Sequence, residues 1–226
     1  MLSQRFPLYL ANRAHQQNAD LAVVDKYSGE TIAHVARADA AVLDQAITAA
    51  AGAAVPMRRL GAWRRKAALN HLLKRCRERS DELTDVLVVE AGKPIQFARG
   101  EVARLLTTIE LGVEESTRIT GEVLPLDITE RAAGYRGMWQ RVPIGPCGFI
   151  TPWNFPLNLV AHKIVPALAC GCPFVLKPAS ATPISALILG EILAEADLPE
   201  GAFSILPMKS SDSAALVEDE RIRKLS

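Results

Sequence analysis

The sequence is poor in cysteine and has no cysteine framework. Its four cysteines are scattered over 226 residues, at Cys76, Cys147, Cys170 and Cys172. Secreted domains held together by disulfides are much denser in cysteine, and zinc knuckles need paired ligand spacings that are missing here. The single residue between Cys170 and Cys172 also differs from a dithiol motif. We therefore predict reduced thiols that serve packing, and no metal site.

The sequence also lacks an excess of charge of either sign. Lys and Arg number 26 against 25 Asp and Glu, which leaves a net charge of +1. Domains that bind nucleic acid usually carry a marked basic excess, so we expect no nucleic-acid partner. The basic cluster from Arg58 to Arg79 is the one feature that favours such a partner. Its alternative is a solvated helix face, balanced by the acidic residues between Glu78 and Glu90.

Long apolar runs are missing as well. No window approaches the roughly 18 apolar residues of a spanning helix, and we expect no membrane association. The N-terminal stretch MLSQRFPLYLANRAHQQN has no continuous apolar segment like that of a signal peptide, so a cytoplasmic location is expected. Hydrophobic residues nevertheless form 49% of the chain, enough at this length for a sizeable core.

The first 120 residues predict a hairpin followed by helices. Two short apolar runs flank Tyr27-Ser28-Gly29 between Leu21 and Ala36, which indicates a hairpin with glycine in the turn. Asp39 is placed to cap a first helix. Apolar residues then recur at helical spacing up to Gly92 and Pro94, and a further helix is expected from Ile95 to about Arg118.

A strand-like segment interrupts this pattern between Gly121 and Arg141. The pieces VLPLDI and YRGMWQRV are separated by Thr129 to Gly134. An isolated two-stranded ribbon is marginal in water, so this segment should pair elsewhere, in the fold or across a subunit boundary. We interpret residues 121–142 as an interaction arm.

After Pro143 the sequence alternates strands and helices with short links. GPCGFIT, PFVLKPA and FSILP are apolar strands, and two helical segments separate them. Thr182 is expected to cap the second helix, with Pro183 at its first position. This rhythm predicts a parallel, doubly wound sheet, which binds ligands at the carboxyl ends of its strands. Asn154 and Lys177 lie there.

Several motifs in this order resemble one family, the NAD(P)-dependent aldehyde dehydrogenases. They are EAGKP at Glu90 to Pro94, PWNFP, PALACGCPFVLKP and the LPEG at Leu198 to Gly201. The resemblance implies an α/β fold, an N-terminal helical region plus an incomplete doubly wound, Rossmann-like sheet. It divides the chain into residues 1–120, the oligomerisation arm 121–142 and the first half of the dinucleotide-binding sheet, 143–226, with no catalytic domain. It also implies a homo-oligomer formed through the arm.

The resemblance assigns a catalytic role to Asn154. In this family a cysteine thiolate attacks the aldehyde, the resulting oxyanion passes a hydride to the nicotinamide, and water hydrolyses the thioester. Asn154 matches the asparagine whose amide donates to that oxyanion. Such a donor is typically worth about 3–4 kcal/mol in the transition state. The alternative is an asparagine that caps the following helix.

The resemblance also assigns the cofactor, NAD or NADP, to the strand ends. Lys177 matches the lysine that hydrogen-bonds the adenosine ribose, and a strand-end lysine can lay its stem along the sheet. Ile150 and Thr151 are implied to contact the cofactor through their backbone. Trp153 is implied to line the cleft, although packing alone would also explain it. Ser180 stands where many NAD-preferring relatives carry glutamate. Serine removes the negative charge that would repel the 2′-phosphate, so this residue favours NADP. Alternatively, it helps to cap the next helix.

The departures from the family pattern limit these expectations. Family members are much longer, and the part beyond Ser226 carries the glycine-rich turn, the general-base glutamate and the nucleophilic cysteine. Met208, Lys209 and Ser210 also stand where the family generally has glycines. We therefore expect the N-terminal part of an enzyme that oxidises an aldehyde, inactive alone. The alternatives are a noncatalytic nucleotide-binding or interaction module, and part of a related acylating reductase.

Overall fold

A six-stranded sheet forms the centre of the computed structural model, which describes residues 5–226. The strand order is β11-β8-β9-β10-β2-β3, and the four strands from β11 to β10 are parallel. β2 runs antiparallel to β10, and β3 runs antiparallel to β2. The strands span Leu8–Leu10 (β2), Arg13–His15 (β3), Cys147–Ile150 (β8), Phe174–Lys177 (β9), Phe203–Ile205 (β10) and Lys224–Leu225 (β11).

The parallel part of the sheet is wound in two directions from β8. The chain passes from β8 through α5 (Asn158–Cys170) to β9, and through α6 (Ile184–Ala194) to β10. It then crosses back through α7 (Ala214–Glu218) to β11 on the other side of β8. The expected doubly wound fold is therefore confirmed. The reversal of strand order between β8 and β11 is a switch point, where such sheets bind ligands.

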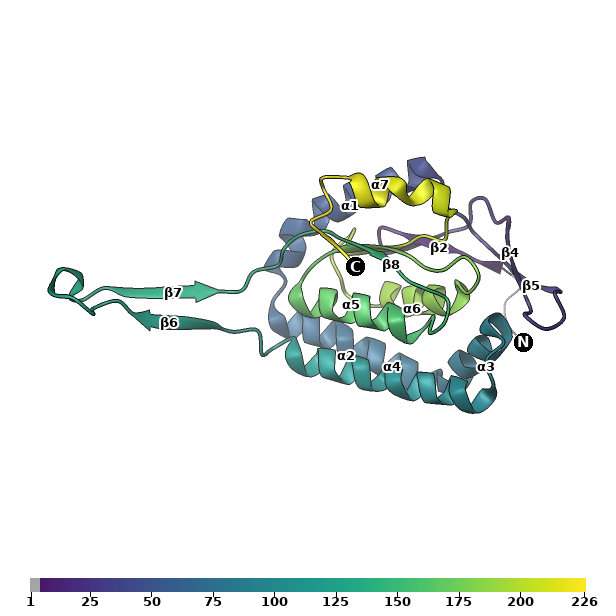
Figure 1. Cartoon of the computed structure of the whole chain (residues 1–226), viewed down its shortest axis with the longest axis horizontal. Helices are drawn as coiled ribbons and strands as arrows, with labels where there is room; N and C mark the ends of the chain where they lie inside the picture. Colours follow the sequence, from purple (N-terminus) through teal and green to yellow (C-terminus); the bar gives the residue numbers. More distant parts are fainter. Residues whose placement is uncertain (1–4) are drawn as a thin grey trace.

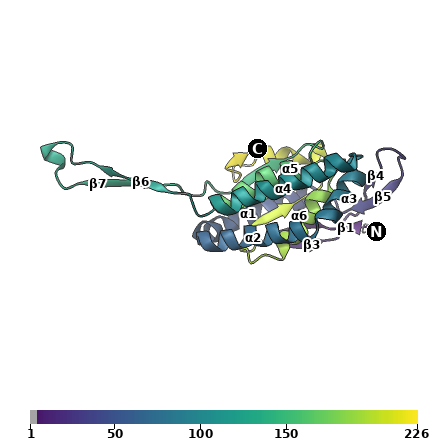
Figure 2. The same ribbon diagram turned by 90° about the horizontal axis from the view of Figure 1, so that it is seen from below.

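Helices cover both faces of this sheet (Figure 1). α1 (Ala40–Arg59) and α7 lie on one face, and α5 and α6 lie on the other. Figure 2 shows the further layer that packs outside α5 and α6, formed by α2 (Ala62–Glu78), α3 (Ser80–Ala91) and α4 (Ile95–Glu115). One core cluster includes buried residues from α2, α4, α5, α6 and the sheet. The N-terminal helices therefore share a core with the residues that follow Pro143.

The N-terminal hairpin forms as expected. β4 (Leu21–Val24) and β5 (Thr31–Val35) are antiparallel, and Gly29 takes a positive φ of 74° in the turn. β1 (Arg5–Phe6) adds a parallel strand to β5. Asp39 caps α1, because its side chain accepts from the N–H of Val42 at 2.9 Å.

The interaction arm contains the two strand-like pieces that the sequence indicates, but within residues 5–226 they pair with each other and not elsewhere in the fold. β6 (Gly121–Pro125) and β7 (Arg136–Gln140) pair in antiparallel register from Gly121 with Gln140 to Pro125 with Arg136. A short 3-10 turn, Glu130–Ala132, closes its tip. The ribbon projects far from the body in both views (Figures 1 and 2). Its strands pair only with each other within residues 5–226.

Two expectations need correction. The first is that no segment is long and apolar enough to span a membrane, because α1 meets this test by length and composition. Core helices pass the same test, and α1 buries Leu43, Ile47 and other residues against the sheet. Thr182 does not cap α6, because its hydroxyl finds no partner within residues 5–226, and Pro183 takes the N-cap position and not the first helical position. Glu90 of α3 caps that helix instead, because its carboxylate accepts from the N–H groups of Ile184 at 2.7 Å and Ser185 at 2.9 Å.

The basic residues of α2 form ion pairs along its surface. Arg64 contacts Asp197, and Arg75 contacts both Glu78 and Glu195. Arg79, which follows the helix, contacts Glu82 and Glu191. These pairs agree with the balanced helix face that the sequence offered as an alternative to a nucleic-acid site.

Candidate cofactor and oxyanion site

The candidate cofactor residues meet at the carboxyl edge of the parallel sheet. Ile150 ends β8 and Lys177 ends β9, and the two residues are direct register partners. The N–H of Thr151 donates to the carbonyl of Lys177 at 3.2 Å, which continues the pairing one residue further. The N–H of Ile150 donates to the carbonyl of Ser226 at 3.1 Å, on the β11 side. Ile150 therefore borders the switch point, as the sheet topology requires of a cofactor residue.

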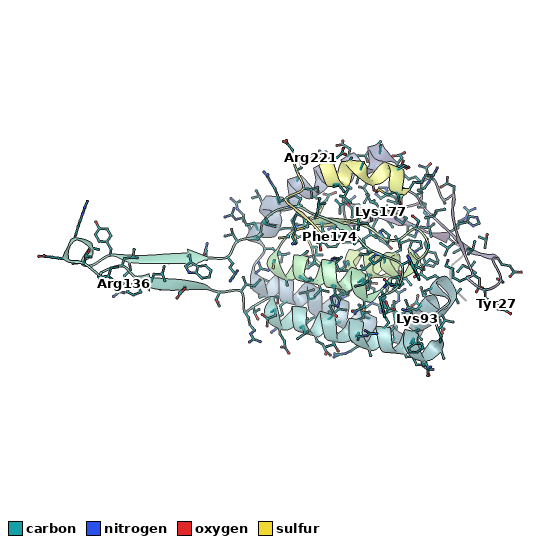
Figure 3. All side chains as sticks on the ribbon, in the orientation of Figure 1. Tyr27, Lys93, Arg136, Phe174, Lys177 and Arg221 are labelled. Atoms are coloured by element: carbon teal, nitrogen blue, oxygen red, sulfur yellow. The ribbon has the colours of Figure 1, made fainter. Side chains whose placement is uncertain are left out.

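Lys177 is a buried cation at this edge. It is 5% exposed, and no ion pair or hydrogen bond of its ammonium group is found within residues 5–226. Burial lowers its pKa below the usual 10.5, because desolvation penalises the charged form. Figure 3 places Lys177 inside the body, away from the arm. An ammonium group buried without a partner is costly, so a ligand hydroxyl or phosphate would satisfy it.

Asn154 lies in the turn between β8 and α5. Its side chain is exposed and makes no hydrogen bond within residues 5–226, so it is not used as a helix cap. Its backbone is held from outside, because the ammonium of Lys93 donates to the Asn154 carbonyl at 3.1 Å. Lys93 also lies 4.3 Å from the centroid of the Phe155 ring. The amide is thus free to donate to a ligand while its backbone is fixed.

Glu101 of α4 fixes the other end of the same turn. Its carboxylate is fully buried and accepts from the N–H groups of Leu157 and Asn158, each at 3.0 Å. These N–H groups belong to the first turn of α5, which cannot satisfy them within the helix. Lys93 completes the arrangement with an ion pair to Glu101. A buried carboxylate thus caps α5 as Glu90 caps α6.

The other expected residues differ in their surroundings. Trp153 is 65% exposed, so its ring is available to line a cleft. Ser180 donates its hydroxyl to the carbonyl of Met208 at 3.1 Å, which ties the loop after β9 to the loop after β10. It does not cap α6. Its hydroxyl proton is therefore used within the chain, whereas the sequence suggested a free donor.

Sequence reasoning missed Lys93, Glu101 and Glu90 as supports of this site. Glu90 and Lys93 belong to the EAGKP stretch, which carries the family resemblance without indicating a role for either side chain. Their partners lie 61 to 95 residues further along the chain, so no local pattern could show the contacts. No group of three or more His, Cys, Asp or Glu side chains in residues 5–226 is placed to hold a metal ion.

Comparison with known proteins identifies the family and the fold. The model of the aldehyde dehydrogenase family matches residues 13–226. Aldehyde dehydrogenase 21 from Physcomitrella patens, solved with the reaction product succinate, is 47% identical with a TM-score of 0.96. The match covers 100% of this chain and 47% of the Physcomitrella patens chain. An NADP-dependent enzyme from E. coli is 32% identical with a TM-score of 0.90, over 98% of this chain and 46% of its own.

Curated relatives include an aspartate-semialdehyde dehydrogenase from Halomonas elongata, 35% identical over 91% of this chain and 41% of its own length. A glutarate-semialdehyde dehydrogenase from Pseudomonas putida is 37% identical over 90% of this chain and 42% of its own. The chain thus spans about two fifths of the length of these relatives. With the family model matched over nearly all of its residues, the chain belongs to the aldehyde dehydrogenase family.

Proposed function

We propose that this chain is the N-terminal, cofactor-binding part of an enzyme that oxidises an aldehyde to a carboxylic acid with NAD or NADP. One observation carries the proposal. Lys177, a buried cation without a partner in residues 5–226, ends β9, and Asn154, an exposed amide on a fixed backbone, follows β8 at the same carboxyl edge of the sheet. The first suits a nucleotide ribose, and the second suits a developing oxyanion.

Some residues of this chain would bind the cofactor, and Asn154 would stabilise the oxyanion. Lys177 would donate to the ribose hydroxyls, Ile150 and Thr151 would border the nucleotide with their backbone, and Trp153 would form a wall of the cleft. The bound nicotinamide supplies the hydride acceptor. Asn154 would donate its side-chain N–H to the oxygen of the aldehyde as negative charge develops there. Lys93 and Glu101 hold the backbone around this amide from the outer helical layer.

The chain alone should have no dehydrogenase activity. Oxyanion stabilisation requires a nucleophile that attacks the carbonyl, and loss of the nucleophile in a covalent mechanism costs many orders of magnitude in rate. The purified chain should therefore reduce neither NAD nor NADP above a heat-killed control when an aldehyde is present. Reduction that Asn154→Ala abolishes would overturn this part of the proposal.

A chimera tests the positive role. We would fuse this chain to the C-terminal remainder of the Physcomitrella patens enzyme, because the two bodies superpose closely. The chimera should reduce the cofactor, and Asn154→Ala should lower its kcat by about 10²- to 10³-fold. Asn70→Ala is the matched control, because Asn70 is an exposed asparagine on α2. An active chimera that tolerates Asn154→Ala would refute the oxyanion role and favour a noncatalytic module.

The substrate we propose is an aldehyde with a second, anionic group. The relatives named above are dehydrogenases of aspartate and glutarate semialdehydes, and the Physcomitrella patens enzyme was solved with succinate. All three molecules carry a carboxylate away from the reacting carbon. A chimera or parent enzyme should therefore show a higher kcat/KM for succinic semialdehyde than for butyraldehyde. Equal values would refute this substrate class.

The arm is proposed to form a homo-oligomer. It exposes large apolar side chains over both strands and the tip: Val123, Ile128, Tyr135 and Met138 are each at least 66% exposed. Such a ribbon is unstable alone, and a second copy of the chain could cover it. Sedimentation at micromolar concentration should show a dimer or larger, and Met138→Glu should dissociate it. A monomeric wild-type chain would contradict the proposal.

A further inference from the structure

The turn of the N-terminal hairpin carries Lys26, to which no sequence motif assigns a role. Lys26 lies between β4 and β5, and its ammonium donates to two backbone carbonyls, that of Val24 at 2.8 Å and that of Ala181 at 2.9 Å. Ala181 lies 155 residues further along the chain, in the link between β9 and α6. The hairpin is therefore tied to the segment that follows Lys177.

The turn holds the backbone of Lys26 in a fixed position. The Asp25 side chain accepts from the N–H groups of Tyr27 and Ser28, each at 2.8 Å. The N–H of Asp25 also donates to the Glu30 carbonyl at 2.9 Å. Since the backbone is already ordered by these contacts, only the lysine side chain has to be ordered for its ammonium to reach both carbonyls.

The stem of Lys26 packs against the end of α3. Gly92 ends this helix with a φ of +64°, and a Cβ built on it would lie 3.0 Å from the Lys26 Cβ. The hairpin and α3 lie side by side at the end of the body opposite the arm in both views (Figures 1 and 2). Glycine at this position therefore permits the close approach of the lysine stem as well as the left-handed backbone.

Ala181 belongs to a short link that carries the expected nucleotide residues. Lys177 ends β9, Ser180 directly precedes Ala181, and α6 begins at Ile184. A contact at the Ala181 carbonyl therefore acts on the backbone between the residue that would bind the ribose and the helix that follows.

Two other contacts hold this link, one on each side of Ala181. Ser180 is tied to the Met208 carbonyl, and the start of α6 is tied to Glu90. Burial raises the pKa of Glu90, and the positive charge of Lys26 is among the influences that oppose this rise. The lysine thus acts on the link directly, through a carbonyl, and on the cap of α6 through its charge.

We propose that Lys26 is a positioning residue for the nucleotide edge, which holds the link after β9 in the shape that Lys177 and Ser180 need to bind a dinucleotide. The inference rests on the proposed function, because it concerns the same edge of the sheet. Hydrogen bonds from a charged donor are stronger than neutral ones, and this ammonium supplies two of them. Without them the binding shape is a smaller fraction of a looser ensemble, which lowers the apparent affinity.

The two dinucleotides should respond differently. Ser180 stands where the 2′-phosphate of NADP is expected, and it adjoins the residue that Lys26 holds. Loosening the link should therefore weaken the binding of NADP more than that of NAD. The alternative is a surface lysine that only adds a little stability, as many exposed charged contacts do. In that case the ratio of the two affinities would not change.

Hydrogen exchange tests the tether on this chain alone. The methionine of Lys26→Met ends where the lysine has its ε-carbon, so this variant keeps the stem against Gly92 and loses only the ammonium. Peptides that cover residues 178–188 should exchange about 3- to 10-fold faster in the variant, and peptides of α4 should exchange as in the wild type. Lys26→Arg should keep the wild-type rates, because a guanidinium can also donate to both carbonyls.

The matched control is Lys74→Met, at an exposed lysine of α2, which should exchange like the wild type. Unchanged exchange over residues 178–188 in Lys26→Met would overturn the proposal.

Calorimetry of the chimera with the Physcomitrella patens remainder tests the role in binding. Lys26→Met should lower the affinity for NADP by about 3- to 10-fold and that for NAD by less, while Lys26→Arg and Lys74→Met should leave both affinities unchanged. A wild-type chimera that binds neither dinucleotide would refute the proposed function and this inference with it. A wild-type chimera that binds both, with an unchanged affinity ratio in Lys26→Met, would overturn this inference and leave the proposed function standing.

Discussion

Glu90 should make the stability of this chain depend on pH in a way that one substitution can isolate. Its carboxylate is fully buried and accepts the first N–H groups of α6, from Ile184 at 2.7 Å and Ser185 at 2.9 Å. Burial raises its pKa from 4.5 to about 7, more than the backbone hydrogen bonds lower it. We predict that Glu90→Gln removes this pH dependence and is most destabilising at low pH.

The direction follows from proton binding. Between the unfolded pKa of 4.5 and the folded pKa of about 7, the folded chain binds more protons at Glu90 than the unfolded chain does. Stability from this group is therefore fully present below the unfolded pKa and is lost as the pH rises through 7. A shift of this size corresponds to about 3 kcal/mol across the whole window.

The chemistry of the two side chains explains the difference between them. A protonated carboxyl keeps an acceptor on each oxygen, so it can serve both N–H groups without a buried charge. Glutamine keeps one acceptor and presents an N–H₂ group to the other donor. One unsatisfied buried N–H costs about 1–3 kcal/mol, so near pH 5 the free energy of unfolding of the wild type should exceed that of the variant by this margin. The margin should shrink or vanish near pH 8, where the wild-type charge is buried.

Urea unfolding at several pH values between about 5 and 8 measures this margin, because the free energy of unfolding extrapolates linearly to water. Other titrating groups affect both proteins equally, so the difference between the two curves belongs to Glu90. Glu130→Gln, in the exposed tip of the arm, is the matched control and should follow the wild type at every pH. Parallel wild-type and Glu90→Gln curves would refute the reasoning.

The other predictions concern Lys177, Ser180 and Gly201. Lys177→Met should weaken dinucleotide binding by about 10-fold or more in calorimetry. It should also raise the free energy of unfolding, because the buried charge is removed. This gain should shrink as the pH rises through the lowered pKa of Lys177 toward 10.5, since the wild-type lysine then loses its charge. The control Lys74→Met, at an exposed lysine, should change neither binding nor stability. In the parent enzyme, the wild type should bind NADP at least as well as NAD. Ser180→Glu should disfavour NADP by up to about 4 kcal/mol, the repulsion of two charges about 4 Å apart at a dielectric of about 20; an unchanged ratio would contradict this role. Gly201→Ala should destabilise by about 2–4 kcal/mol in urea, because Gly201 has a φ of +80° and an added Cβ would lie 2.5 Å from the Ala49 oxygen. Gly29→Ala, at a φ of +74° in open space, should cost only about 1–2 kcal/mol, and equal losses would exclude the steric reason.

The βαβ half of the fold could be predicted from the sequence because its signals are local. Short apolar strands between glycines and prolines, each followed by a helix, leave few other topologies. The hairpin was predictable for the same reason, because it pairs two neighbouring segments. The strand-like pieces of the arm were also visible locally, but we expected them to pair elsewhere and not with each other. The tract before Gly92 was correctly predicted to be helical, but the break within it was not predicted. In the structure, Arg79 separates α2 from α3.

The strands at the N-terminus could not be predicted in this way. β2 has three residues, too few for a periodic pattern, and Tyr9 pairs with Ile205 almost at the other end of the chain. The turn from β2 to β3 uses positive φ angles at Ala11 and Asn12, and alanine gives no signal for that conformation. Such pairings depend on the finished sheet rather than on nearby residues.

The same distinction explains which site residues the sequence revealed. Asn154 and Lys177 stand at strand ends, where the order of elements alone predicts a ligand. Their supports come from the outer helices: Glu90 caps α6, Glu101 caps α5, and Lys93 holds the Asn154 carbonyl. Each support is buried or nearly buried and acts on backbone groups, so it fixes the start of a helix that borders the site. The N-terminal helices therefore do more than enlarge the core, since they set the position of the cofactor edge. A change in the EAGKP stretch should reach the site through these helix starts without touching a ligand.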